Sequence, residues 1–177
     1  MDAKRLTLSY DETEDRIRLD CADGSQAVRL LLTRRITRQL VRGFAETLAT
    51  SSAVVARAPA DMRREALVIE HMSAVMAPPA DTPSGGPQKR PDEGGDRLAE
   101  GLVHRVDVEV TPTIFRLLFH SAAGVPVTLS PGRGDFHRLL ASLAKLAGQA
   151  GWDLGGEADW LDNAESVALS PAGRSAS

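Results

Sequence analysis

The sequence is poor in cysteine and in aromatic residues. Among its 177 residues there is one cysteine, Cys21, and aromatic residues make up only 4%. A single cysteine excludes an intramolecular disulfide and a cysteine-rich zinc site. With so few aromatic side chains, the core has to be built mainly from Leu, Val, Ile and Ala. Hydrophobic residues make up 42% of the chain, which is enough for such a core.

Long hydrophobic runs are also lacking. No segment approaches the roughly 18 consecutive apolar residues of a membrane-spanning helix. The N-terminal residues do not contain the apolar stretch of a secretory signal peptide. We therefore expect a cytoplasmic protein that does not contact membranes. The net charge of −3 argues against a protein whose whole surface binds nucleic acid.

The sequence offers little catalytic or metal-binding chemistry. No two of the four histidines have the spacing, with a glutamate, that helical zinc hydrolases need; they are His71, His104, His120 and His137. We expect surface or structural roles for them. Cys21 ends the apolar face of a predicted strand, so its expected state is a buried, unreactive thiol. We predict no enzymatic activity, no cofactor and no metal site.

The most informative stretch runs from Ala27 to Leu48. In its first part Val28, Leu30 and Leu32 alternate with other residues, which predicts a strand with one buried face. Thr33 is a good N-cap for a following helix. The apolar residues of that helix fall on one stripe, formed by Ile36, Leu40, Val41, Phe44 and Leu48.

The opposite face of this helix is strongly basic. It carries four arginines, Arg34, Arg35, Arg38 and Arg42, and no acidic residue occurs between Gly24 and Ala45. Like charges four residues apart on a helix repel by a few tenths of a kcal/mol per pair. The arginines are therefore expected either to pair with the acidic turn at 11–15 or to bind an acidic surface outside the chain.

The elements of the first half recur in the second half. Alternation predicts strands near residues 6–10, 16–21 and 28–32 before the first helix, and near 106–110, 114–120 and 125–129 before another helix after Gly134. Equivalent positions lie about 100 residues apart, as at Gly24 and Gly124. We predict an α+β fold of two β-β-β-α repeats packed as a pseudo-symmetric unit, with antiparallel meander sheets backed by amphipathic helices. The alternative is a chance likeness between two simple meanders.

Composition divides the chain into four parts. Residues 1–77 form the first unit plus an extra helix beginning near Pro59. Its packing face is expected to contain Met62, Ala66, Ile69 and Met76, widened by Leu67, Met72 and Val75. Residues 78–101 are rich in proline, glycine and charge, which predicts a flexible linker. Residues 102–154 form the second unit, and 155–177 are expected to be a largely disordered tail.

Apolar positions in these elements predict the core. The expected core residues are Leu8, Ile17, Leu19, Leu30, Ile36, Leu40, Phe44, Val108, Leu117, Phe119, Val127, Phe136, Leu140 and Leu143. We expect Trp152 to join them. For Trp160, flanked by Asp159 and Asp162, a core role and an interface role are equally favoured, since a large aromatic near a flexible end can anchor a partner.

These observations favour a non-catalytic binding or adaptor module. We predict that it docks a protein with an acidic surface through Arg34, Arg35, Arg38, Arg42 and Trp160. The alternative is an accessory protein that contacts the phosphate backbone of single-stranded nucleic acid. Repeated β-β-β-α units also occur among single-strand-binding transcription factors, which is an analogy of architecture only. The scarcity of aromatic residues for base stacking counts against this alternative.

Overall fold

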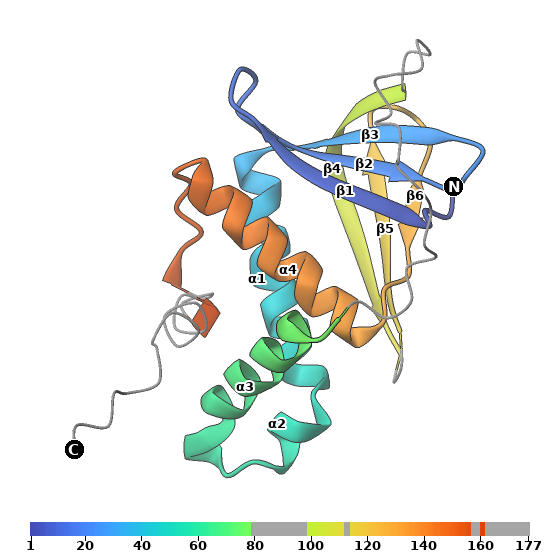
Figure 1. The fold of residues 1–177 in the computed structure, drawn as a ribbon. Coiled ribbons are helices and arrows are strands. Elements are labelled where there is room, and N and C mark those ends of the chain that lie inside the picture. The colour runs from blue at the N-terminus through green and yellow to red at the C-terminus, as the bar shows by residue number, and fades with distance from the viewer. Residues whose placement is uncertain (79–98, 112–113, 157–159, 162–177) are drawn as a thin grey trace, which may run out of the picture.

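The computed structural model describes residues 1–78, 99–111, 114–156 and 160–161. In these ranges the chain forms an α+β fold, a curved six-stranded sheet with its helices gathered on one side (Figure 1). The helices are α1 (Arg34–Ser51), α2 (Ala53–Arg57), the 3-10 helix η1 (Ala60–Met62), α3 (Arg63–Met76) and α4 (Arg133–Gln149). None of the helices in the described part of the chain is long and apolar enough to cross a membrane.

The strands follow one another across the sheet in the order of the sequence. They are β1 (Arg5–Asp11), β2 (Arg16–Ala22), β3 (Ala27–Leu32), β4 (Ala99–Val110), β5 (Phe115–Ser121) and β6 (Val127–Leu129). Neighbours are antiparallel except β3 and β4, which are parallel and pair from Val28 with Ala99 to Leu31 with Leu102. The two halves therefore share one sheet instead of forming two separate meanders.

Curvature of the sheet brings its two ends together. Asp2, just before β1, forms a parallel bridge with Thr128 of β6. The Ala3 amide donates to the Thr128 carbonyl at 2.9 Å, and the Thr128 amide donates to the Met1 carbonyl at 2.8 Å. The inward side chains of all six strands can therefore meet in one core.

The long helices α1 and α4 close this core from one side (Figure 1). α1 begins as expected after Thr33, whose hydroxyl accepts a hydrogen bond from the Ile36 amide at 3.2 Å. α4 begins earlier than expected, at Arg133 and not after Gly134, and Gly132 is its N-cap. Twelve of the fourteen expected core residues are buried; Leu8 is half-buried and Val108 is exposed.

The expectation for Val108 is wrong for a topological reason. Val108 pairs with the buried Leu117 and so faces the same side of the sheet, yet it is 40% exposed. Beyond Leu102, β4 has no pairing with β3, so one edge of the strand is open. β4 also begins at Ala99, which places the last residues of the predicted linker in a strand; linker residues 79–98 lie outside the described ranges.

The extra helix occurs where it was expected, but only part of its expected packing face is covered: Leu67 is buried and Ala66 is half-buried. Ile69 and Met76 are 65% and 77% exposed, and Met62 of η1 is also exposed. α3 buries Leu67, as expected, and also His71, which was not expected on this face, and it packs on α2 and α4. The contact face of α3 is narrow because this helix packs mainly against other helices. It includes polar residues because His71 and Glu70 of α3 contact His137 and Arg133 of α4.

Gly101 allows the start of β4 to pack closely against the turn after β5. A Cβ at Gly101 would lie 2.2 Å from the backbone nitrogen of Ala123. We expect Gly101→Ala to lower the free energy of unfolding by about 1–3 kcal/mol through overpacking. Urea titration measures this effect.

Gly43 provides the matched control for that substitution. It lies inside α1, and a Cβ there would meet no atom within 4 Å. Gly43→Ala is expected to raise the free energy of unfolding by about 0.5–1 kcal/mol, because alanine restricts the unfolded chain and favours helix. Equal effects of the two substitutions would contradict the close approach at Gly101.

Candidate functional site

The four arginines of α1 lie on its solvent-facing side. Arg34, Arg35, Arg38 and Arg42 are all exposed, whereas Ile36, Leu40 and Phe44 on the other side of the helix are buried. We call these four residues the arginine ridge. Within the described ranges, Arg34, Arg35 and Arg38 form no hydrogen bond or ion pair through their side chains. These three arginines are thus available to an external anion.

The acidic turn before β2 does not neutralise the ridge. Asp15 accepts hydrogen bonds from the Tyr10 hydroxyl at 2.8 Å and the Trp152 indole at 2.9 Å, and these bonds hold its pKa below the ordinary value. Arg34 adds a weaker electrostatic contribution to that shift. Asp11 forms its ion pair with Arg18. Asp11 and Asp15 therefore have other partners within the chain.

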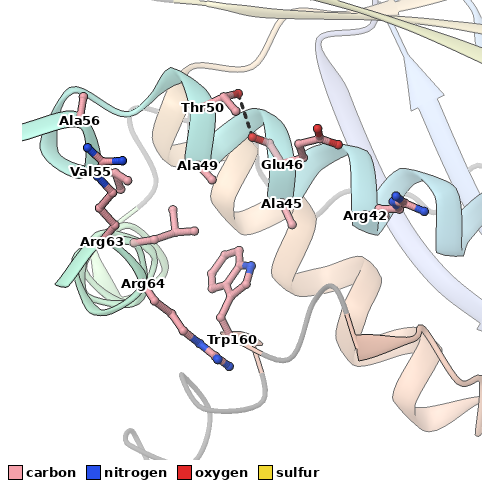
Figure 2. Close-up of a pocket in the computed structure, with 11 residues that line it drawn as sticks. Arg42, Ala45, Glu46, Ala49, Thr50, Val55, Ala56, Arg63, Arg64 and Trp160 are labelled. Atoms are coloured by element: carbon pink, nitrogen blue, oxygen red, sulfur yellow. Dashed lines mark hydrogen bonds between the residues drawn. The ribbon is translucent and has the colours of Figure 1, made fainter. Parts of the chain in front are cut away.

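A groove opens at the C-terminal part of the ridge, between α1, α2 and α3 (Figure 2). We call it the helical groove; its volume is about 850 Å³. Its walls are apolar and mostly small, formed by Ala45, Ala49, Val55, Leu67 and Trp160. Charged residues at the groove are Arg42, Glu46, Arg63 and Arg64, so positive charge exceeds negative by two. Arg42 belongs to both the ridge and the groove.

Trp160 is buried in the structure and also lines this groove. It is 7% exposed, and the following Leu161 is 6% exposed. The indole packs edge-on against His71, with 5.0 Å between ring centroids and an angle of 88° between their planes. Figure 2 shows the indole standing between α1 and α3. Trp160 and the arginine ridge are therefore neighbours through Arg42, although Trp160 does not project into solvent.

Behind Trp160, a polar cluster joins three helices. Glu70 of α3 accepts a hydrogen bond from the Ser52 hydroxyl at 2.6 Å and another from Arg133 at the start of α4. Arg133 also donates to the Leu48 carbonyl and the Ser51 hydroxyl, both at 2.9 Å. Burial opposes ionisation of Glu70, but the bonds from Arg133 and Ser52 outweigh it and keep its pKa below the ordinary value.

Two buried histidines complete the cluster. The Nδ1 atoms of His71 and His137 are 3.0 Å apart, so one ring donates and the other accepts. The Nε2 atom of His137 lies 3.6 Å from a Glu70 carboxylate oxygen, which favours a proton on that nitrogen. His71 then donates to His137. Burial lowers the pKa of His71 to about 4 and also lowers that of His137, so both rings are neutral at neutral pH.

Sequence reasoning missed this cluster. Arg133 and His137 are four residues apart, as are Leu67 and His71, so each pair shares a helix face. That spacing is the signal that polar groups point inward on both helices. The contact itself joins positions 66 residues apart in the chain, and no local pattern indicates it.

The described part of the chain contains neither a reactive thiol nor a metal-binding cluster. Cys21 is buried, and desolvation raises the pKa of its thiol to about 12. In the described ranges there is no group of three or more His, Cys, Asp or Glu placed to hold a metal ion.

Comparisons with protein-family models, with curated proteins and with solved structures find no match for this chain. Function therefore has to be argued from the ridge and the groove.

Proposed function

We propose that the protein is a non-catalytic binding module that docks an acidic protein surface on the arginine ridge. The observation that supports this most directly is the exposure of the ridge together with the engagement of Asp11 and Asp15 elsewhere. Repulsion between its arginines is relieved when carboxylates bind across them. A charged surface such as the arginine ridge mainly accelerates association and discriminates between partners, and it contributes less to affinity.

A protein partner is favoured over single-stranded nucleic acid by the aromatic residues. All seven are described, and none is exposed: Tyr10 is half-buried, and the others, Phe44, Phe115, Phe119, Phe136, Trp152 and Trp160, are buried. Single-strand binders stack bases on exposed aromatic rings. The ridge would offer nucleic acid phosphate contacts only, which confer affinity without sequence preference.

The test uses Arg34→Glu/Arg35→Glu/Arg38→Glu, a variant that leaves the groove residue Arg42 intact. Because all three side chains are exposed, we expect the variant to remain folded, with each change altering the free energy of unfolding by about 0.5 kcal/mol or less. Proteins captured by the wild-type chain are identified by mass spectrometry, purified and titrated. We expect the partner to bind the variant at least about tenfold more weakly, with affinity that falls as salt rises.

The control is Lys4→Glu/Arg5→Glu/Arg116→Glu, which changes the net charge equally on exposed strand and N-terminal positions. It should retain the partner. Loss of binding in both variants would indicate a nonspecific charge effect and contradict a docking role for the ridge. Retention of single-stranded oligothymidylate by the wild type, lost in the ridge variant, would favour nucleic acid instead.

We also infer that the two halves are repeats of one β-β-β-α unit. Each half has three strands followed by a long helix, and Gly24 and Gly124 both adopt positive φ, at 105° and 77°. The parallel junction between β3 and β4 has a counterpart in the parallel bridge of Asp2 with Thr128. A unit repeated by rotation around the sheet would produce both junctions.

The cytoplasmic location stays a prediction from the sequence.

A further inference from the structure

The helical groove has the features of a peptide-docking site. The side chains of α1 that line it, Ala45 and Ala49, are small, so a peptide can approach the helix backbone closely. A volume of about 850 Å³ is in the range of ligand pockets. Arg63 and Arg64 are exposed and form no ion pair within the described part of the chain.

Trp160, which lines the groove, indicates the chemistry of a segment that fits it. Trp160 and Leu161 are the hydrophobic pair of the sequence Glu157-Ala-Asp-Trp-Leu-Asp162, and both are buried. Trp160 reaches the groove from the C-terminal side of α4 and packs on His71. An apolar anchor within an acidic sequence therefore meets an apolar groove with positive charge at its edge.

We propose that the helical groove docks an acidic peptide of a partner protein through an aromatic anchor, and that Trp160 occupies the anchor position in cis. This proposal rests on the proposed function in one respect, that the partner is an acidic protein. The two surfaces are adjacent, because Arg42 belongs to the ridge and also lines the groove. The ridge attracts the partner's acidic surface, and the groove supplies the apolar contact that most of the affinity depends on. The partner has to displace Trp160, so the tethered segment lowers its apparent affinity.

The test uses a fluorescein-labelled peptide with the sequence of residues 157–166, EADWLDNAES, added in trans to full-length protein. The receptor is Trp160→Ala, which vacates the anchor position. We expect saturable binding to this variant, measured by fluorescence anisotropy. We expect at least about tenfold weaker binding to the wild type, because a tethered competitor acts at millimolar effective concentration. A peptide with alanine in place of its tryptophan should not bind.

Charge variants locate the peptide. In the Trp160→Ala background, Arg63→Glu/Arg64→Glu is expected to weaken peptide binding at least about tenfold. The control, Arg5→Glu/Arg116→Glu, makes the same charge change on the sheet and should alter binding by less than about threefold. Equal weakening by both pairs would overturn the proposal, since attraction would then be general.

Three further outcomes would also overturn it. In the first, the wild type and Trp160→Ala bind the peptide with equal affinity. In the second, oligothymidylate displaces the peptide when the two are present at the same concentration. In the third, the wild type forms dimers by exchanging its tail between two chains. If Trp160→Ala does not fold, the wild type is titrated with millimolar peptide. Faster amide exchange at Trp160 and Leu161 would then support displacement, and unchanged exchange would refute it.

The groove and the ridge can fail separately. Peptide binding needs no natural partner, so it can succeed when the ridge variant Arg34→Glu/Arg35→Glu/Arg38→Glu still retains captured proteins. Conversely, a partner that depends on the ridge but does not compete with the peptide would leave the proposed function intact and remove the groove from it.

Discussion

Phe136→Ala is expected to lower the free energy of unfolding by about 3–5 kcal/mol. Phe136 is fully buried and holds three elements together: its ring stacks parallel on Phe115 of β5 at 4.3 Å and tilts against Phe44 of α1 at 4.6 Å. Truncation removes both ring contacts and leaves a cavity between α4, α1 and the sheet. A domain of this size commonly has only about 5–15 kcal/mol in total.

Urea titration followed by circular dichroism measures this loss. Ile69→Ala on α3 is the control, because Ile69 is 65% exposed and its truncation should change the free energy of unfolding by about 0.5 kcal/mol or less. In a double-mutant cycle, Phe44→Ala and Phe136→Ala should be non-additive, since the two rings touch. A loss below about 1 kcal/mol for Phe136→Ala would mean that this aromatic cluster does not hold the layers together.

Acidification from pH 7 to pH 5 is expected to destabilise the protein by about 2 kcal/mol through His71 alone. The pKa of His71 falls from an ordinary 6.5 to about 4 on folding because the ring is desolvated and lies beside His137. The unfolded chain therefore takes up a proton at higher pH than the folded chain does. The resulting loss of stability begins as the pH falls below 6.5, the pKa in the unfolded chain, and is complete below about 4, the pKa in the folded chain.

Protonation of His137 also breaks the contact between the rings, because His71 already donates through its own Nδ1 and the new proton on His137 goes to the accepting Nδ1. With both Nδ1 atoms carrying hydrogen, the 3.0 Å contact of His71 and His137 would set two donors against each other beside the Arg133 charge. The lowered pKa of His137 moves stability in the same direction. Glu70, with a pKa below its ordinary value of 4.5, loses its contribution only at lower pH. The window from pH 6.5 to 5 therefore isolates the histidines.

His71→Asn separates titration from hydrogen bonding. The asparagine amide can donate to His137 Nδ1 from nearly the same place, but it does not titrate. Free energies of unfolding at pH 7 and pH 5 should then differ less in the variant than in the wild type, by about the 2 kcal/mol assigned to His71. An identical pH dependence of the two proteins would show that His71 titrates normally when folded.

The same cluster links stability to the proposed groove. His71 contacts Trp160 on one side and His137 on the other. Weakening of the histidine pair at low pH is therefore expected to affect the placement of Trp160 as well. The arginine ridge, which lies along α1 on the opposite side from the apolar stripe, involves none of these groups.

Local pattern was sufficient for the elements in which each residue's neighbours in sequence are its neighbours in space. The cap at Thr33, the buried stripe of Ile36, Leu40 and Phe44, and the hairpins β1–β2 and β2–β3 all depend on contacts within a few residues or across one turn. Strand and helix periodicity report those contacts directly. The exposure of the arginine ridge follows from the same helical period.

Periodicity was insufficient where an element packs against a partner far away in the sequence. α3 has apolar residues on more than one face, and the partners available on α4 decided that Leu67 and His71 are buried while Ile69 is exposed. Val108 alternates correctly, but its burial depends on what covers the end of β4. Trp160 could have been placed either way, because its surroundings come from α1 and α3.

The sequence by itself therefore determined the α+β class, the order of strands and helices, and the basic face of α1, since all three depend on the period of side chains along a strand or helix. Only the tertiary structure decided that β3 and β4 join in parallel, that His71 meets His137 beside Glu70, and that Trp160 lines a groove with arginines at its edge. Each of those features is a contact between distant segments. Such contacts are determined by the packing of the whole core. Several arrangements of the same strands and helices satisfy the local pattern equally well, and they differ in how much apolar surface they bury and how many hydrogen bonds they form.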